Sequence, residues 1–256
     1  MQEISKKKQE PSIGKVVLEV NGLTKAYGNT IAVNNLDILI EKGEIFGLLG
    51  HNGAGKTTTI ECILNTRKKD SGSIAILGLQ LEKDRKRIFE RVGVQMQEAH
   101  FQEKIKVKEI CENTSALYSN PLDYNLLLKD FSLYDRRTNY VSELSGGQRQ
   151  KLSVLIALLS DPQLLFLDEL TTGLDPKARR EIWKYLDIQK QKGKSILLTS
   201  HYMDEVQYLC DRICILKNGS PQITGTTQEV ILKSGTQTLE EAYLFYTGEE
   251  VEYESI

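Results

Sequence analysis

One glycine-rich loop gives the strongest chemical signal in this 256-residue sequence. It fits the pattern GxxxxGK followed by Ser or Thr, and its residues are Gly50, His51, Asn52, Gly53, Ala54, Gly55, Lys56, Thr57 and Thr58. In such a loop, backbone N–H groups curl around phosphates at a helix N-terminus. The lysine reaches the β- and γ-phosphates, and the threonine hydroxyl can bind Mg²⁺. The loop therefore predicts a site for nucleotide phosphates, with Thr57 as a metal ligand.

The segments around this loop favour that interpretation over a chance glycine turn. The apolar run IFGLLG, residues 45–50, predicts a buried strand before the loop, and a helix is expected to begin near Lys56. Strand, loop and helix in that order are the context that the pattern requires.

Two adjacent carboxylates are the second chemical signal. The apolar run LLFL, residues 164–167, predicts a buried strand, and Asp168 and Glu169 follow it directly. Ligands of open α/β sheets bind at the carboxyl ends of the strands. Taken alone, such a pair is more simply a solvated strand end. Together with the phosphate loop it predicts a hydrolytic site, in which Asp168 holds Mg²⁺ through water and Glu169 polarises the attacking water as general base.

A third pattern separates this chain from other enzymes with a phosphate loop. The residues Ser145, Gly146, Gly147 and Gln148 precede a helix that is expected from Arg149 onward. A helix N-terminus favours negative charge, the serine offers a hydroxyl, and glycines let backbone N–H groups approach a ligand. A flexible linker is the alternative, but the apolar helix directly behind the motif argues against it.

These patterns, in this order, resemble the ATP-binding cassette (ABC) family, over about Val16 to Gly225. The resemblance implies that Ser145–Gln148 are the signature motif, which contacts a γ-phosphate held by the opposite subunit of a dimer. It also implies a general-base role for Glu169. The other nucleotide-binding and catalytic residues that it implies are Gln97, which contacts metal and attacking water, Asp175 of the D-loop, His201 at the γ-phosphate and Tyr27 against adenine.

The resemblance has one ambiguity in register and one departure from the family pattern. Gln95 lies close enough to Gln97 to leave the register ambiguous, and Gln97 is preferred because its spacing from Gly93 fits better. Leu170 stands where the family usually has proline, which affects local rigidity more than nucleotide contacts.

The elements that must position these residues alternate between strand and helix. Strands are predicted at residues 15–20, 31–40, 164–167 and 195–199, and a helix at 176–191. This alternation favours an α/β fold with a mostly parallel sheet, and the resemblance makes it a P-loop NTPase core with an N-terminal antiparallel β subdomain and an inserted helical subdomain. The predicted divisions are a polar tail at 1–14, a core at 15–97 and 142–225, a helical insertion at 98–141 and a short C-terminal extension at 226–256.

Composition excludes several other functions. The net charge of −2 and the acidic C-terminal stretch give no reason to expect nucleic-acid binding. Four cysteines without a CxxC pair are expected to be reduced thiols of a cytosolic protein. No apolar stretch approaches the roughly 20 residues that span a bilayer, and no signal-peptide core follows the N-terminal lysines. A membrane-spanning part would therefore belong to another chain.

The resemblance predicts an ATPase that converts ATP and water to ADP and phosphate, needs Mg²⁺, and pairs with itself or a related cassette. It would work at the cytoplasmic face of the cell membrane with a separate integral membrane permease. The run HYMDE, residues 201–205, and LEEAYLFYTG, residues 239–248, resemble ABC-2 type exporters of drugs, antibiotic peptides or lipids. An amino-acid-type importer cassette, a soluble ABC ATPase and, more remotely, a P-loop kinase are the alternatives.

Overall fold

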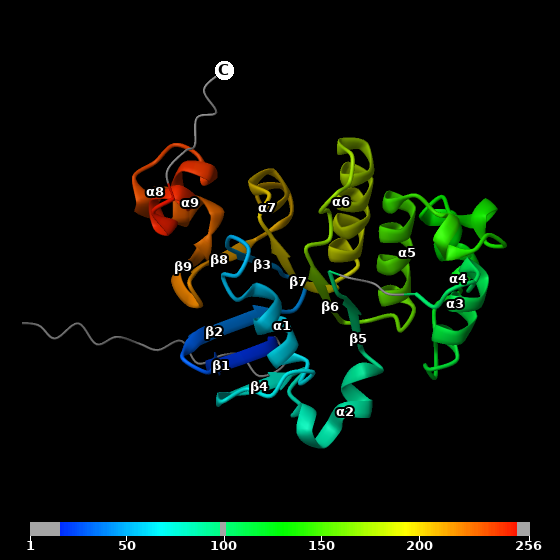
Figure 1. Cartoon of the computed structure of the whole chain (residues 1–256), viewed down its shortest axis with the longest axis horizontal. Helices are drawn as coiled ribbons and strands as arrows, with labels where there is room; N and C mark the ends of the chain where they lie inside the picture. Colours follow the sequence, from blue (N-terminus) through cyan, green and yellow to red (C-terminus); the bar gives the residue numbers. More distant parts are fainter. Residues whose placement is uncertain (1–15, 98–100, 250–256) are drawn as a thin grey trace, which may run out of the picture.

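The computed structural model describes residues 16–97 and 101–249. Its larger sheet has six strands in the order β5-β6-β7-β3-β8-β9 (Figure 1). Every neighbouring pair is parallel except β8 and β9, which are antiparallel. In chain order the strands are β3 (Ile45–Leu49), β5 (Val92–Gln95), β6 (Leu164–Asp168), β7 (Ser195–Ser200), β8 (Arg212–Lys217) and β9 (Ser220–Thr226).

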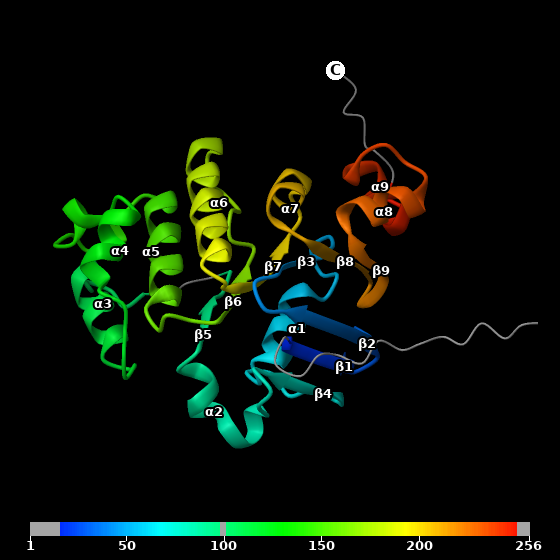
Figure 2. The ribbon, with the colours of Figure 1, turned by 180° about the vertical axis from the view of Figure 1, so that it is seen from behind.

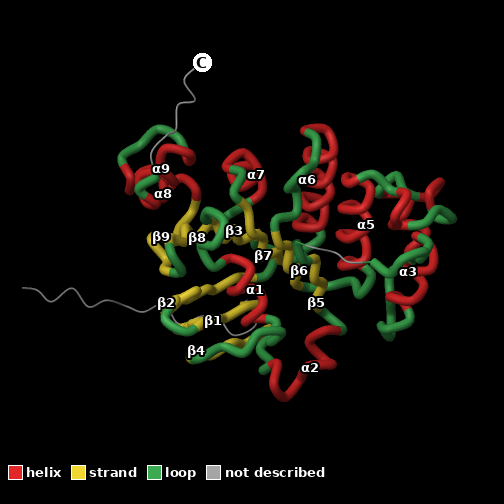
Figure 3. Tube along the Cα trace, viewed as in Figure 1, coloured by secondary structure: helices red, strands yellow, loops and turns green. Residues whose placement is uncertain are grey.

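A smaller antiparallel sheet, in the order β2-β1-β4, lies beside the first (Figure 3). Its strands are β1 (Val16–Tyr27), β2 (Thr30–Glu41) and β4 (Ser71–Ile76). The expected fold class is confirmed: the chain is an α/β protein with a mostly parallel sheet and an N-terminal antiparallel sheet.

Both faces of the larger sheet are covered, which explains its apolar strands. Every residue of β3, β6 and β7 is buried, as expected for strands with helices or a second sheet on each side. Helix α1 (Lys56–Ile63) lies between the two sheets, where Ile60 and Ile63 share one apolar cluster with residues of both. On the other face, α5 (Gly146–Leu158) and α6 (Pro176–Gln191) contribute to a second cluster.

The remaining helices lie at the edges of the molecule. Between β5 and α5, residues 101–145 form helices and loops that stand on the outer side of α5 (Figure 2). The helices are α2 (Leu81–Phe89), α3 (Val107–Ser115), α4 (Tyr124–Asp130), α7 (Met203–Leu209), α8 (Thr227–Ser234) and α9 (Leu239–Thr247), with 3₁₀ turns at Tyr134–Arg136 and Val141–Glu143. Within the described ranges, no helix is both long and apolar enough to cross a bilayer.

Helix α5 begins at Gly146, so the expected start at Arg149 was wrong. Ser145 is the N-cap, and its Oγ accepts a hydrogen bond from the Gln148 backbone N–H at 3.3 Å. In turn, the side-chain oxygen of Gln148 accepts a hydrogen bond from the Ser145 backbone N–H at 3.0 Å. This reciprocal capping box satisfies two backbone donors, which offsets the weak helix propensity of the two glycines.

The close contact between β5 and α5 gives a prediction about stability. A Cβ atom added at Gly93 would lie 2.0 Å from the Ala157 carbonyl oxygen and 2.7 Å from a Leu165 methyl group. Gly93→Ala is therefore expected to lower the free energy of unfolding by about 1–3 kcal/mol or more, the usual cost of overpacking. Chemical denaturation measures this. Gly146→Ala is the matched control, because no atom lies within 4 Å of its added Cβ; an equal loss in both variants would contradict the steric argument.

Candidate functional site

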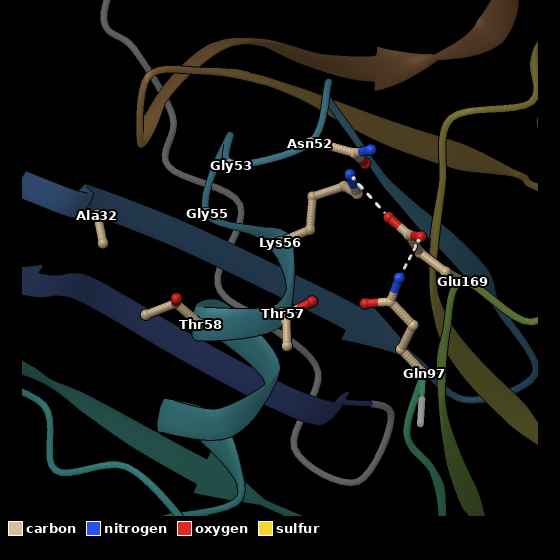
Figure 4. A pocket seen from close by; sticks show the side chains of 9 residues that line it. All are labelled: Ala32, Asn52, Gly53, Gly55, Lys56, Thr57, Thr58, Gln97 and Glu169. Carbon is tan, nitrogen blue, oxygen red and sulfur yellow. Dashed lines mark hydrogen bonds and ion pairs between the residues drawn. The ribbon is translucent and has the colours of Figure 1, made fainter. Parts of the chain in front are cut away.

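A cavity of about 340 Å³ lies between the glycine-rich loop and the ends of the central strands (Figure 4). Its lining residues come from β2, from the loop after β3, from the segment after β5 and from the end of β6. They are Ala32, Asn52, Gly53, Gly55, Lys56, Thr57, Thr58, Gln97 and Glu169.

The loop adopts a conformation that depends on its glycines. Gly53 and Gly55 have φ values of +86° and +102°, which side chains other than glycine rarely adopt. A Cβ at Gly55 would also lie 2.2 Å from the Ala32 carbonyl oxygen. Helix α1 begins at the next residue, Lys56, so the loop faces the positive end of that helix. This arrangement is suited to binding phosphate.

Lys56 and Glu169 meet inside the cavity. The Lys56 Nζ donates to the carbonyl oxygens of Gly50 at 2.7 Å and His51 at 3.1 Å, and it lies 3.2 Å from the Glu169 Oε1. The Gln97 Nε2 donates to the Glu169 Oε2 at 2.8 Å. Both carboxylate oxygens therefore have a partner, and the carboxylate points at the place where the loop would hold phosphates.

His201 approaches the same carboxylate from the end of β7. Its Nδ1 lies 3.9 Å from the Glu169 Oε1, and this nitrogen is buried without a hydrogen-bond partner in the part of the chain that the structure describes. The expected catalytic residues Gln97, Glu169 and His201 are thus brought together. Gln95 instead is buried, and its side-chain amide donates to the Met96 carbonyl, so Gln97 and not Gln95 lines the cavity.

Asp168 is fully buried beside this group. Its Oδ1 accepts a hydrogen bond from the Thr199 hydroxyl at 2.5 Å, whereas its Oδ2 has no partner among the described residues. Burial raises the pKa of the Asp168 carboxyl, and hydrogen bonds from Thr199 and Thr57 act against that rise. A buried carboxylate oxygen without a partner, next to the Thr57 hydroxyl, fits a hard cation with oxygen ligands.

Among the described residues, no group of three or more His, Cys, Asp or Glu side chains could hold a metal ion. That finding does not conflict with Mg²⁺ here, because Mg²⁺ is typically held by one or two protein ligands together with phosphates and water. Thr57, Asp168 and Gln97, the predicted metal ligands, each carry a side-chain oxygen atom of the kind that such a site needs.

The structure places other expected residues outside the cavity. Tyr27 is 42% exposed and does not line it; its ring instead lies between the Lys25 Nζ and the Arg67 guanidinium, at 5.3 Å and 5.6 Å from the ring centre. The signature residues stand at the start of α5, as described above. Asp175 caps α6, and its Oδ1 accepts from the backbone N–H groups of Lys177 and Ala178, which lowers its pKa.

Two residues of the site are not evident from the sequence. Thr199 lies directly opposite Asp168 in the parallel pairing of β6 and β7, and its Oγ1 also accepts the Glu169 backbone N–H at 2.9 Å. Ala32 lines the cavity from β2 and lies against Gly55. Thr199 could have been found from the strand SILLTS only if its register against LLFLDE were known.

The backbone at Glu169 is itself unusual. Its φ is +47°, a left-handed conformation that is uncommon for residues other than glycine and that clusters at functional sites. The Thr199 hydroxyl holds this residue and Asp168 at once.

Comparison with known proteins places these features in a family. Residues 33–172 match the family model described as ABC transporter. The Nod factor export ATP-binding protein I of Cupriavidus pinatubonensis is 38% identical over 220 residues, which cover 84% of this chain and 68% of that protein. The protein of the same name from Rhizobium etli is 35% identical over 249 residues, covering 93% of this chain and 76% of the relative. Across these similar relatives the matched part is between 64% and 77% of their length.

Solved structures of ABC transporter subunits have the same fold as this chain. One described as the ATP-binding subunit of an ABC transporter has a TM-score of 0.83 at 29% identity, and the match covers 90% of this chain and 99% of that one. A second, cbiO1 from Clostridium perfringens, described as part of the ABC transporter complex cbiONQ, has a TM-score of 0.73 at 26% identity, covering 86% and 92%.

The two hydrogen bonds of Thr199 give a prediction. Thr199→Val removes the donor to Asp168 and the acceptor of the Glu169 N–H while keeping the side-chain shape. We expect the free energy of unfolding to fall by about 1–3 kcal/mol, the cost of leaving a buried polar group unpaired, as measured by chemical denaturation. Thr199→Ser keeps the hydroxyl and should lose less. Equal losses in the two variants would contradict the argument that the two hydrogen bonds of the hydroxyl carry this stability.

Proposed function

This chain belongs to the ABC transporter family, and we propose that it is the cassette that binds and hydrolyses ATP to drive a separate membrane exporter. The observation that carries the proposal is the position of Glu169. Its carboxylate lies within reach of the phosphate-loop lysine Lys56, of Gln97 and of His201.

In the proposed reaction, residues 50–58 hold the triphosphate of ATP, with backbone N–H groups and Lys56 against the β- and γ-phosphates. Glu169 accepts a proton from the water that attacks the γ-phosphorus in line, and ADP leaves with the oxygen of the broken bond. Gln97 orients that water, since its amide already contacts the Glu169 carboxylate. Thr57, Asp168 and Gln97 would hold Mg²⁺, which neutralises charge that develops on the phosphoryl oxygens. His201 donates to the γ-phosphate.

The remaining site residues fit a second role, at a dimer interface. Ser145–Gln148 stand at the start of α5 and are exposed or half-buried. They lie next to the loop before α6, because a Cβ at Gly147 would be 3.7 Å from both Leu174 and Ala178. We propose that these residues and Asp175 contact ATP held by a second cassette, either another copy of this chain or a related one. Tyr27 would stack on adenine, since its ring is exposed beside β1.

The export assignment is supported by relatives named Nod factor export ATP-binding protein I. We propose that residues 98–141, of which the described part 101–141 lies beside α5 (Figure 2), form the subdomain that contacts an integral membrane permease of the ABC-2 type, at the cytoplasmic face of the cell membrane. Exported drugs, antibiotic peptides or lipids are the proposed substrate classes. Nucleic acid is not a proposed partner, because the net charge is −2.

The role of Glu169 is tested by Glu169→Gln. Glutamine keeps the size of the side chain but cannot accept the proton, so hydrolysis is expected to fall roughly 10²–10⁴-fold, the usual contribution of a general base. ATP binding, measured by calorimetry, and ATP-dependent dimerisation, measured by size-exclusion chromatography, should persist. Glu61→Gln is the matched control, since it changes an α1 carboxylate that does not line the cavity. Near-normal turnover in Glu169→Gln would remove Glu169 from this role.

The transport assignment is tested by affinity purification. The tagged chain is recovered from detergent-solubilised membranes, and its partners are identified by mass spectrometry, with the untagged chain as control. We expect a polytopic membrane protein to co-purify with the tagged chain alone. Recovery of only soluble partners, or of ribosomes, would overturn the transport proposal and leave the ATPase assignment standing.

A further inference from the structure

Helices α6 and α7 are joined by side-chain contacts that the proposed reaction does not use, and two of these pairs lie near the start of α7. The Arg179 guanidinium lies 4.1 Å from the ring centre of Tyr202, and the Trp183 Nε1 donates to the Glu205 Oε1 at 2.9 Å. Arg179 and Trp183 are four residues apart on α6 and therefore share one helix face. Tyr202 and Glu205 lie at the start of α7. We call these four residues the α6–α7 clasp.

The inner pair of the clasp is buried. Glu205 is 2% exposed and Trp183 is 7% exposed, and the outer face of the indole stacks on the Tyr208 ring at 5.5 Å. Burial raises the pKa of the Glu205 carboxyl, while polar contacts with Ser200, Trp183 and Thr171 act against that rise. A buried carboxyl is costly unless its oxygens are hydrogen-bonded, and the indole N–H supplies one of these hydrogen bonds to Glu205.

The clasp connects two segments that border the proposed catalytic site. On the α6 side, residues 171–175 link Glu169 to the start of the helix, and Asp175 is the N-cap of that helix. On the α7 side, Ser200 and Tyr202 flank His201, and the His201 and Tyr202 rings lie 4.2 Å apart. The same four side chains therefore border the loop after the general base and the histidine beside it.

We propose that the Trp183–Glu205 hydrogen bond positions the catalytic residues. It holds the start of α7, and with it His201, against the loop that carries Glu169 and Asp175. Glu205 and Trp183 are positioning residues and touch no reacting atom. The inference rests on the catalytic roles proposed above for Glu169 and His201. Because a misplacement of about 1 Å can cost on the order of 10²-fold in rate, one buried hydrogen bond at this junction is enough to influence turnover.

Loss of the clasp is expected to affect turnover and ATP binding differently. Residues 50–58, which are proposed to hold the phosphates, form a loop and helix start after β3, and Lys56 in this segment bonds to Gly50 and not to a clasp residue. Loss of the clasp should therefore lower kcat and leave KM for ATP nearly unchanged. A general loss of stability would also lower the apparent kcat at constant KM, because it reduces the folded fraction of the protein. For each variant kcat is therefore expressed per folded molecule, with the folded fraction taken from its thermal denaturation curve.

The test is a double-mutant cycle on steady-state ATP hydrolysis by the full chain. Trp183→Phe removes the donor and keeps a smaller aromatic ring, Glu205→Ala removes the acceptor, and the third variant carries both changes. Each single change is expected to lower kcat about 10-fold with KM within 2-fold of the parent. The double variant should be no slower than either single variant, because the effects of two substitutions that remove the same hydrogen bond do not add. Glu205→Gln keeps an acceptor oxygen and should restore kcat to within about 2-fold.

Two controls make the result decisive. Ile182→Val shortens a buried side chain of the same helix and leaves all four clasp side chains in place; it should lower the melting temperature and leave kcat per folded molecule unchanged. The chain has one tryptophan, so the fluorescence of Trp183 reports directly whether Glu205→Ala alters the indole environment.

Additive effects in the double variant, an unchanged kcat in either single variant, or a failure of Glu205→Gln to restore turnover would each overturn the positioning role. So would a kcat that simply follows the melting temperature across all variants, including Ile182→Val. If the parent chain itself hydrolyses no ATP, the proposed function fails, and that outcome is distinguishable because it precedes any comparison of variants.

Discussion

The parallel pairing of β5, β6, β7 and β3 is the constraint on which the site depends. Parallel strands place their carboxyl ends at the same edge of a sheet, and here each of the four strands is followed by one part of the site. Gln97 follows β5, Glu169 follows β6, His201 follows β7 and the phosphate loop follows β3. Residues as far apart in sequence as Gly50 and His201 therefore converge at one edge of the sheet, and the apolar interiors of the strands keep their ends fixed.

The electrostatics of the site follow from the same burial. Asp168 and Glu169 are adjacent buried carboxyls, and Lys56 lies 3.2 Å from Glu169. Two negative charges beside one ammonium leave an excess of negative charge in a region of low dielectric, where an unpaired charge is expensive. Burial accordingly raises the pKa of Asp168. A divalent cation at the Asp168 oxygen that has no partner among the described residues would compensate this charge, and this is the basis for the proposed role of Asp168 as a metal ligand.

Sequence patterns predicted the parts of this site that depend on local chemistry. The phosphate loop, the two carboxylates and His201 each follow a short apolar run, so their places at strand ends could be derived from the chain itself. Thr199 could not, because its role depends on the register of β7 against β6. Gln95 and Gln97 are two positions apart, so the sequence alone does not decide between them. Because β5 ends at Gln95, Gln97 lies beyond the strand, where it reaches the cavity. The start of α5 was misplaced because helix propensity gives too little weight to a capping box over two glycines.

Strain at Glu169 links this geometry to rigidity. A left-handed residue other than glycine costs on the order of 1–3 kcal/mol and persists only when its surroundings hold it. At Glu169 the surroundings are specific: its N–H is held by the Thr199 hydroxyl, and its carboxylate by Lys56 and Gln97. Thr199 belongs to β7 and Lys56 to α1, so the conformation is fixed from two elements that are far apart in sequence. A residue held in this way can present its carboxylate in one direction, and any movement of β7 or of the phosphate loop must act on it directly.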